Sequence, residues 1–260
     1  MHTNGMLIVT VTALVTASAS ADTLTIFSSG FEPSEGYSPG NLAGQLGWAS
    51  FLGESPDFGK VTAVNPITGS QSIMIDGQDV ELGTFGNYAG VYLPVSVPAT
   101  YNGMPLTSIE ITGRAAISDP TLDPDHFSAG NFSLWKDGFT FCTNLGPNSE
   151  FGQLTFGWEL PNALPVQDGV VFEFRHVADY TTGLASQWMN GTPVYVDFAD
   201  SFNPSVIPNE IYFDMFSFDF LPFDTKVWYD DIVVTATYVP TPATLSLLGS
   251  AACLVIRRRR

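Results

Sequence analysis

The sequence predicts an all-β protein, a two-sheet antiparallel jelly-roll sandwich, and its composition and strand pattern are the observations that predict this fold class. The 260 residues include 24 Gly and 18 Pro, and only 13% of them are charged. Gly and Pro weaken helices, and the charged residues that favour helices are scarce, which excludes a helical bundle. A further 13% are aromatic. This content can bury a large core, so the chain is not intrinsically disordered.

Short β-rich segments alternate with Gly, Pro, Asn and Asp breaks, and none of them shows a sustained 3.6-residue apolar period. In chain order, the expected strands are residues 23–27, 60–64, 71–75, 88–93, 107–117, 131–135, 139–141, 153–159, 170–177, 184–189, 193–198, 210–220 and 226–238. About thirteen strands exceed an immunoglobulin module and fit a larger jelly roll. Because no linker or internal repeat divides them, they predict one domain over residues 22–238.

Two tight turns mark hairpins within this series. Asp137-Gly138 and Asn190-Gly191 each separate two of the expected strands. Asp-Gly and Asn-Gly supply the positive φ angles that two-residue hairpin loops require. Both segments are therefore expected to reverse the chain between neighbouring antiparallel strands.

The charge balance argues against nucleic acid as a partner. Nine Lys and Arg stand against 26 Asp and Glu, a net charge of −17, and four of the nine are the arginines at 257–260. The remaining five leave the rest of the chain at −21. A body with this charge would repel a phosphate backbone.

The N-terminus predicts export. Residues 7–19 form an apolar run that ends in Ala19-Ser20-Ala21, directly before Asp22. A short apolar core followed by an A-x-A site is typical of a secretory signal peptide, here residues 1–21. The first six residues contain no Lys or Arg, so a buried N-terminal strand is the alternative interpretation.

The C-terminal residues 239–260 combine three features. Val239, Pro240, Thr241 and Pro242 precede a 14-residue apolar stretch, 243–256, which is followed by Arg257, Arg258, Arg259 and Arg260. The stretch is shorter than the roughly 20 residues of a full membrane span, and terminal arginines stay on the cytoplasmic side. This order resembles the PEP-CTERM sorting tail of exported bacterial proteins, with Thr241 where that family has Glu. The resemblance implies transient inner-membrane anchoring, removal of the tail by a membrane sorting peptidase, and delivery to the cell envelope or extracellular polysaccharide.

The body resembles exported concanavalin A-like (LamG-like) jelly rolls. The segments that carry the resemblance are FEPSEGY at 31–37, GNLAGQLGW at 40–48, WYDDIVV at 228–234 and the turn at Asn190-Gly191. The resemblance implies the same sandwich. The family spans sugar-binding modules, adhesion domains, glycosidases and lyases, so the fold alone does not select an activity.

The same resemblance suggests a structural calcium ion. In similar jelly rolls a calcium ion often joins an N-terminal acid to an acid of the last strand, and here Glu32 and Asp230 or Asp231 occupy comparable positions. Carboxylate oxygens suit this ion. Adjacent strand residues point to opposite faces, so only one of the two aspartates is expected to act by its side chain. Solvated acids without a metal are the alternative.

No catalytic set is recognised in the sequence. Glycoside hydrolysis needs two carboxylates across the scissile bond, whereas Glu159 and Glu173 each stand alone on an expected strand. Glu173 and Arg175 alternate with apolar residues, which predicts that one face of their sheet meets solvent. Cys142 lies in no catalytic motif and is expected to be a small buried hydrophobe.

Tryptophans are the candidate sugar-binding residues, because an aromatic ring with polar neighbours suits a sugar. Trp135 and Trp188 lie beside the two hairpin turns and are the expected platforms, whereas Trp228, beside an Ile-Val-Val run, is expected in the core. The sequence thus predicts an exported, non-catalytic protein of the cell surface or extracellular matrix, carbohydrate-binding or structural. A glycoside hydrolase or polysaccharide lyase with an unrecognised acidic site is the alternative.

Overall fold

The structure is a computed structural model. It describes residues 20–51, 58–79, 88–122, 127–138, 140–150, 153–157, 163–199, 202–217 and 224–240. The signal-peptide core, Glu159, the apolar stretch 243–256, and Thr241, Pro242 and Arg257–Arg260 of the sorting motif lie outside these residues. Among the residues described, no helix has the length and apolar character needed to cross a membrane.

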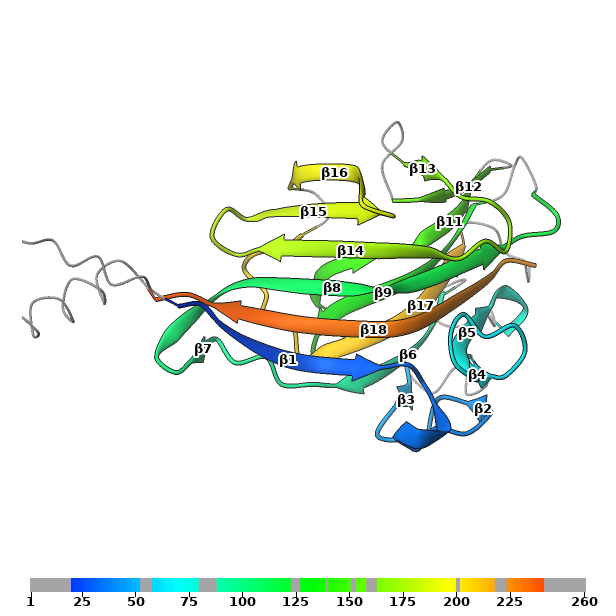
Figure 1. The fold of residues 1–260 in the computed structure, drawn as a ribbon, viewed down its shortest axis with the longest axis horizontal. Coiled ribbons are helices and arrows are strands. Elements are labelled where there is room, and N and C mark those ends of the chain that lie inside the picture. Colours follow the sequence, from blue (N-terminus) through cyan, green and yellow to red (C-terminus); the bar gives the residue numbers. More distant parts are fainter. Residues whose placement is uncertain are drawn as a thin grey trace, which may run out of the picture.

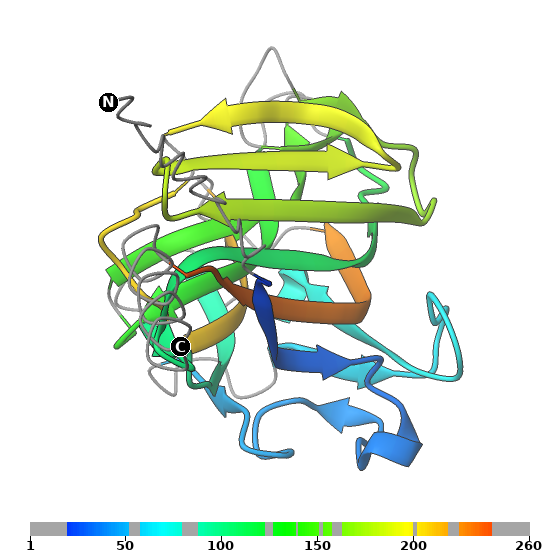
Figure 2. The same ribbon diagram turned by 60° about the vertical axis from the view of Figure 1, so that its left-hand side comes forward.

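Two antiparallel β-sheets lie face to face, as Figures 1 and 2 show. In order across the first, ten-stranded sheet are β16 (Thr192–Phe198), β15 (Leu184–Met189), β14 (Phe172–Asp179), β8 (Met104–Ser118), β18 (Lys226–Tyr238), β5 (Ser72–Asp76), β4 (Lys60–Thr62) and β2 (Gly40–Asn41). Two further strands extend it, β1 (Asp22–Ser29) along β18 and β7 (Thr100–Tyr101) along β8.

The second, eight-stranded sheet lies behind the first in Figure 1. Its order is β13 (Leu164–Pro165), β12 (Gln153–Phe156), β11 (Pro147–Glu150), β9 (Phe127–Lys136), β17 (Glu210–Ser217), β6 (Tyr88–Pro94) and β3 (Ala49–Ser50), and β10 (Thr140–Leu145) pairs with β9. Two short 3₁₀ helices, η1 (Pro33–Glu35) and η2 (Gly77–Asp79), complete the elements described. The predicted fold class, an all-β two-sheet sandwich, is confirmed.

Both predicted hairpins are present. Asp137 and Gly138 join β9 to β10 with φ angles of 54° and 71°, and Asn190 and Gly191 join β15 to β16 with 49° and 76°. Asn190 and Gly191 form a two-residue turn between the paired residues Met189 and Thr192, and their positive angles match the twist of the strands. In the first hairpin Lys136 pairs with Thr140, so the connection is three residues long. The second hairpin joins β15 to β16, the edge strand of the ten-stranded sheet.

The core lies between the sheets and is strongly aromatic. Phe213 of β17 lies at its centre, with Trp48 stacked on it at 5.4 Å and Phe132 edge-on at 5.2 Å between ring centroids. Tyr229 of β18 meets the same ring from the opposite sheet at 5.3 Å. Each buried large ring contributes about 1.5–3 kcal/mol by leaving water. This shared cluster fixes the two sheets against each other.

Trp228 is not a core residue, contrary to the sequence prediction. Its neighbours Val227 and Tyr229 are fully buried between the sheets. Strand residues alternate between faces, so Trp228 lies on the outer face of the ten-stranded sheet, where it is partly exposed. The Ile-Val-Val run that follows suggested that Trp228 is buried. The face that a strand residue occupies depends instead on its position in the alternation.

Candidate functional site

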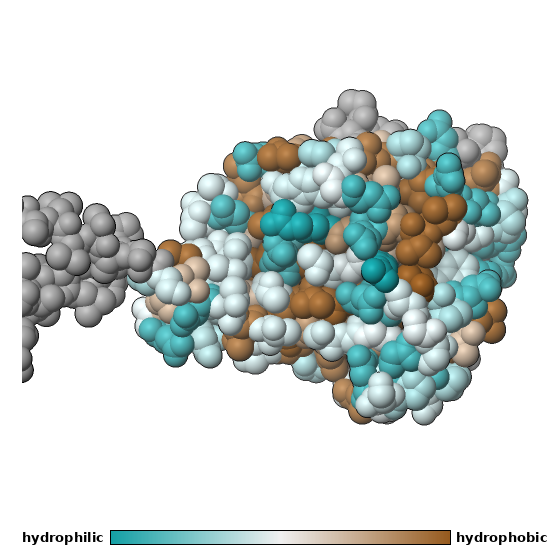
Figure 3. Space-filling view, in the orientation of Figure 1, coloured by the Kyte–Doolittle hydropathy of each residue, from teal (hydrophilic) through white to brown (hydrophobic). Residues whose placement is uncertain are grey.

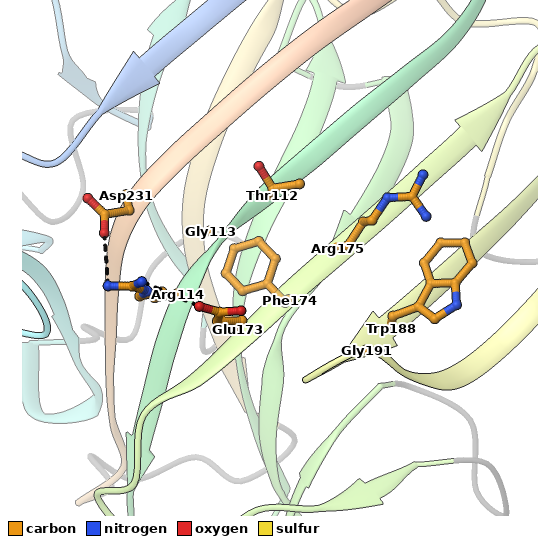
Figure 4. Close-up of a pocket in the computed structure, with 9 residues that line it drawn as sticks. All are labelled: Thr112, Gly113, Arg114, Glu173, Phe174, Arg175, Trp188, Gly191 and Asp231. Atoms are coloured by element: carbon orange, nitrogen blue, oxygen red, sulfur yellow. Dashed lines mark hydrogen bonds and ion pairs between the residues drawn. The ribbon is translucent and has the colours of Figure 1, made fainter.

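A hollow of about 560 Å³ lies on the outer face of the ten-stranded sheet, over β8, β14, β15 and β18. Figure 4 shows the residues that line it, which include Arg114, Glu173, Arg175, Trp188 and Asp231. In the space-filling view of this face, hydrophilic side chains gather over the middle of the sheet, and a hydrophobic band crosses the strands beside them (Figure 3). The hollow thus joins charged and aromatic side chains on one open surface.

The alternation of β14 places its charged residues on this surface. Phe172 and Phe174 are buried in the core, whereas Glu173 and Arg175, which alternate with them along the strand, are exposed, as the sequence predicted. Antiparallel pairing then sets Glu173 opposite Arg114 of β8. Side chains directly opposite in neighbouring strands can make contact.

The first charged group of the site centres on Arg114. Its two terminal nitrogens each lie 3.3 Å from a carboxylate oxygen, Nη2 from Glu173 and Nη1 from Asp231 (Figure 4). All three side chains are substantially exposed, Glu173 to 70%. Exposed pairs of this kind add little stability. Their polar atoms remain within reach of a ligand.

The second charged group joins Arg175 to Trp188, its cross-strand partner on β15. The guanidinium lies 4.5 Å from the centre of the indole ring. Its Nε and Nη2 donate hydrogen bonds of 2.9 and 2.6 Å to one oxygen of Glu110. A guanidinium over an indole gains cation–π attraction. The contact holds Trp188 at the end of the hollow, beside the Asn190-Gly191 turn.

The two predicted sugar-binding tryptophans occupy opposite faces of the sandwich. Trp188 lines the hollow. Trp135 lies on β9 of the other sheet, packed at 5.5 Å against Phe141 and 5.8 Å against Tyr212, and its Nε1 is buried with no hydrogen-bond partner. Trp188 lies among the charged groups of the hollow, whereas Trp135 has Glu210 of β17 as its cross-strand partner, and a role for Trp135 stays a prediction.

Asp230 and Asp231 do not alternate across β18 as expected. The register between β18 and β8 shifts between Asp230 and Val233, and Asp231 adopts a φ of +50°. A bulge of this kind re-aims the side chains next to it. As a result the Thr68 hydroxyl donates to both aspartates, at 2.8 Å to Asp230 and 3.2 Å to Asp231. The bulge also allows the Asp231 carboxylate to form its ion pair with Arg114.

The acids predicted to bind calcium are held by protein donors. Glu32 accepts hydrogen bonds from the backbone and hydroxyl of Ser70, which lower its pKa. Asp230 accepts from Thr68 and from the Ser72 hydroxyl, while its burial raises its pKa. In the described part of the chain, no three His, Cys, Asp or Glu side chains form a group that could hold a metal ion. These acids tie residues 68–72 to the segment after β1 and to β18, and the calcium site stays a prediction.

On the outer face of the eight-stranded sheet lies a buried acid, whose burial the sequence analysis did not predict. Asp214 of β17 is 2% exposed and accepts hydrogen bonds from Asn131 at 2.9 Å and Ser133 at 2.6 Å. Burial raises its pKa to about 6, against the effect of the two donors. These donors come from β9, so only the β9–β17 register reveals the cluster.

No family model matches the chain, and no curated protein matches its sequence. Among solved structures, the cellulose induced protein Cip1 is similar with a TM-score of 0.50 and 15% identity, over 80% of this chain and 96% of that one. A carbohydrate esterase of the Shiga toxin-encoding bacteriophage phi24B gives 0.49 and 16%, over 85% and 100%. The binding domain of botulinum neurotoxin serotype D/C gives 0.47 and 12%, over 81% and 48%. The likeness to Cip1 shows the fold, so the chain has a jelly-roll body.

Proposed function

We propose that this protein binds carbohydrate, without catalysis, in the hollow on the outer face of its ten-stranded sheet. The observation that carries the proposal is the contact of Trp188 with Arg175 at the end of a hollow that also holds Arg114, Glu173 and Asp231. A sugar ring has an apolar face that packs on an aromatic ring. Its hydroxyl groups both donate to carboxylates and accept from guanidinium groups.

The carboxylates of the hollow favour binding over hydrolysis. A catalytic acid is normally sheltered from water, as in an apolar pocket that keeps it protonated. Glu173 is 70% exposed and ion-paired, and Asp231 shares the same arginine. Both carboxylates are thus placed to accept hydrogen bonds from a ligand. This favours the binding interpretation over the glycosidase or lyase alternative.

Affinity electrophoresis against a panel of neutral and acidic polysaccharides tests the proposal. Trp188→Ala should weaken retention about tenfold, the equivalent of about 1.4 kcal/mol. Trp135→Ala tests the other predicted sugar-binding residue, on the opposite sheet, and unchanged retention in this variant would restrict binding to the hollow. Circular dichroism and thermal melting of each variant establish that it is folded. Absence of retention on every polysaccharide would overturn the proposal, and sugar release from any of them would favour the enzyme.

Export to the cell envelope or the extracellular polysaccharide is the second part of the proposal. It is supported by the signal-peptide pattern of residues 1–21 and by the resemblance of residues 239–260 to a PEP-CTERM tail. A sorting peptidase would remove that tail after transient anchoring in the inner membrane. Intact-mass measurement of native protein should then show a chain that begins near Asp22 and lacks Arg257–Arg260. Secreted protein that keeps these arginines would contradict the tail assignment.

A further inference from the structure

A second tryptophan lies on the same face as the hollow. Trp228 of β18 is paired with Ala116 of β8 on one side and with Met74 of β5 on the other. It is partly exposed, and so is Met74, whereas Ala116 is nearly covered. Trp228 therefore lies on the same outer face as the hollow but outside its lining, in an apolar row with Ala116 and Met74, and its Nε1 is buried without a hydrogen-bond partner.

The strand registers place Trp188 and Trp228 at the two ends of a diagonal. Trp188 is in register, through Arg175, with Thr112 of β8, and Trp228 is in register with Ala116 of the same strand. Trp188 and Trp228 are therefore separated by four residues along the strands, about 13 Å, and by three strand spacings across the sheet, about 14 Å. Along the diagonal the two tryptophans are roughly 20 Å apart. Several consecutive sugar rings would cover this distance, and a single ring would not.

The Arg114–Glu173 ion pair lies midway along this diagonal. Arg114 is two residues from Thr112 and two from Ala116 on β8, and Glu173 is its partner on β14. From β15 to β18 the surface therefore offers an aromatic ring, a pair of charged groups and a second aromatic ring. This order suits a linear glycan, because each sugar ring offers an apolar face to an aromatic ring and hydroxyl groups to charged side chains.

The charges along the diagonal do not favour an acidic chain. Arg114 and Arg175 both already have carboxylate partners, which are Glu173, Asp231 and Glu110. Three carboxylates against two arginines leave this surface net negative, on a chain with a net charge of −17. A uronate or sulfate polymer would be repelled over a Debye length of about 10 Å. A neutral glycan meets no such cost and can bond to both signs of charge through its hydroxyls.

We propose that the site takes a neutral, linear polysaccharide chain that lies diagonally across the strands from Trp188 to Trp228. This inference rests on the proposed function and adds the class of glycan, its direction on the sheet and a second aromatic contact. Binding should therefore strengthen with chain length until both tryptophans are covered. A disaccharide reaches only one of them.

Calorimetric titration with cello-oligosaccharides and laminari-oligosaccharides of increasing length tests this inference. For at least one of the two series, the hexasaccharide should bind about tenfold more tightly than the disaccharide. Trp228→Ala should remove this gain and leave disaccharide binding unchanged, and Trp228→Phe, which keeps an aromatic ring, should restore most of it. Alginate and polygalacturonate should bind at least tenfold more weakly than the neutral polymers.

Chemical oxidation of tryptophan in the unmodified protein, read by mass spectrometry, provides a measurement without a variant. The hexasaccharide should protect both Trp188 and Trp228, and the disaccharide only one. Length-independent affinity, an unchanged gain in a folded Trp228→Ala variant, or a preference for the acidic polymers would overturn this inference while carbohydrate binding stands. No binding to any glycan would overturn the proposed function itself.

Discussion

Replacing the buried Asp214 should change how stability depends on pH. The side chain is 2% exposed, and burial raises its pKa from 3.8 to about 6. A raised pKa means that the folded state binds the proton more tightly than the unfolded state does. Stability from this group therefore increases as the pH falls from above 6 towards 4, and is lost as it rises through 6.

The size of the effect follows from the shift. Two pKa units correspond to about 3 kcal/mol, the upper limit of what ionisation of Asp214 costs the folded state at pH 7. Asp214→Asn removes the charge, and the amide oxygen of the new side chain can still accept a hydrogen bond from Asn131 or Ser133. The Ser133 hydroxyl can also accept a hydrogen bond from the new amide nitrogen. The variant should thus gain about 1–3 kcal/mol at pH 7 relative to the wild type, and little or nothing at pH 4.

Urea unfolding of both proteins between pH 4 and pH 8 measures this difference. Comparing the two proteins cancels the general effect of pH on a chain with a net charge of −17. Asp197→Asn is the matched control, because Asp197 lies at an exposed position of β16 whose φ of +56° Asn tolerates. A variant that is less stable than the wild type by the same amount at every pH would refute the reasoning.

Three further outcomes are expected. The Cys142 thiol is buried, which raises its pKa to about 11. A thiol reagent at pH 8 should therefore label Cys142 only after unfolding, and rapid labelling of the native chain would contradict its buried position. Gly130→Ala should cost at least 1–3 kcal/mol by overpacking, because a Cβ there would lie 2.6 Å from Cγ2 of Val227; an unchanged melting temperature would count against the sheet packing described. Arg114→Gln should weaken glycan binding but change stability by less than about 1 kcal/mol, because its ion pairs with Glu173 and Asp231 are exposed, and a larger stability loss by urea unfolding would make Arg114 a structural residue.

Strands bounded by tight turns and regular alternation could be predicted from the sequence. β15 begins and ends at the predicted residues, because Asn190-Gly191 marks its end and its composition is typical of a strand. β18 was predicted to the residue for similar reasons. β11 was missed, because it begins at Pro147 and buries the polar residues Asn148 and Ser149 where apolar ones are expected. Its burial depends on neighbours distant in the sequence.

The site could be predicted in part. Trp188 was predicted as a sugar-binding residue because it lies beside a hairpin turn, and the outward positions of Glu173 and Arg175 were predicted because their strand alternates. Arg114 could not be found, because its place depends on the register between β8 and β14. Asp231 was predicted only as a candidate calcium ligand, because its approach to Arg114 depends on a bulge. Register is a long-range property, and a shift of one residue moves every side chain to the other face.

Hydrogen-exchange mass spectrometry with and without a bound glycan tests the central claim most directly, because it locates the ligand in the unmodified protein. Binding in the hollow should protect segments of β8, β14 and β15 that include Arg114, Arg175 and Trp188, and leave β9 and β17 of the opposite sheet unchanged. Protection confined to β9 and β17, around Trp135 and Asp214, would move the site to the other face and contradict the account.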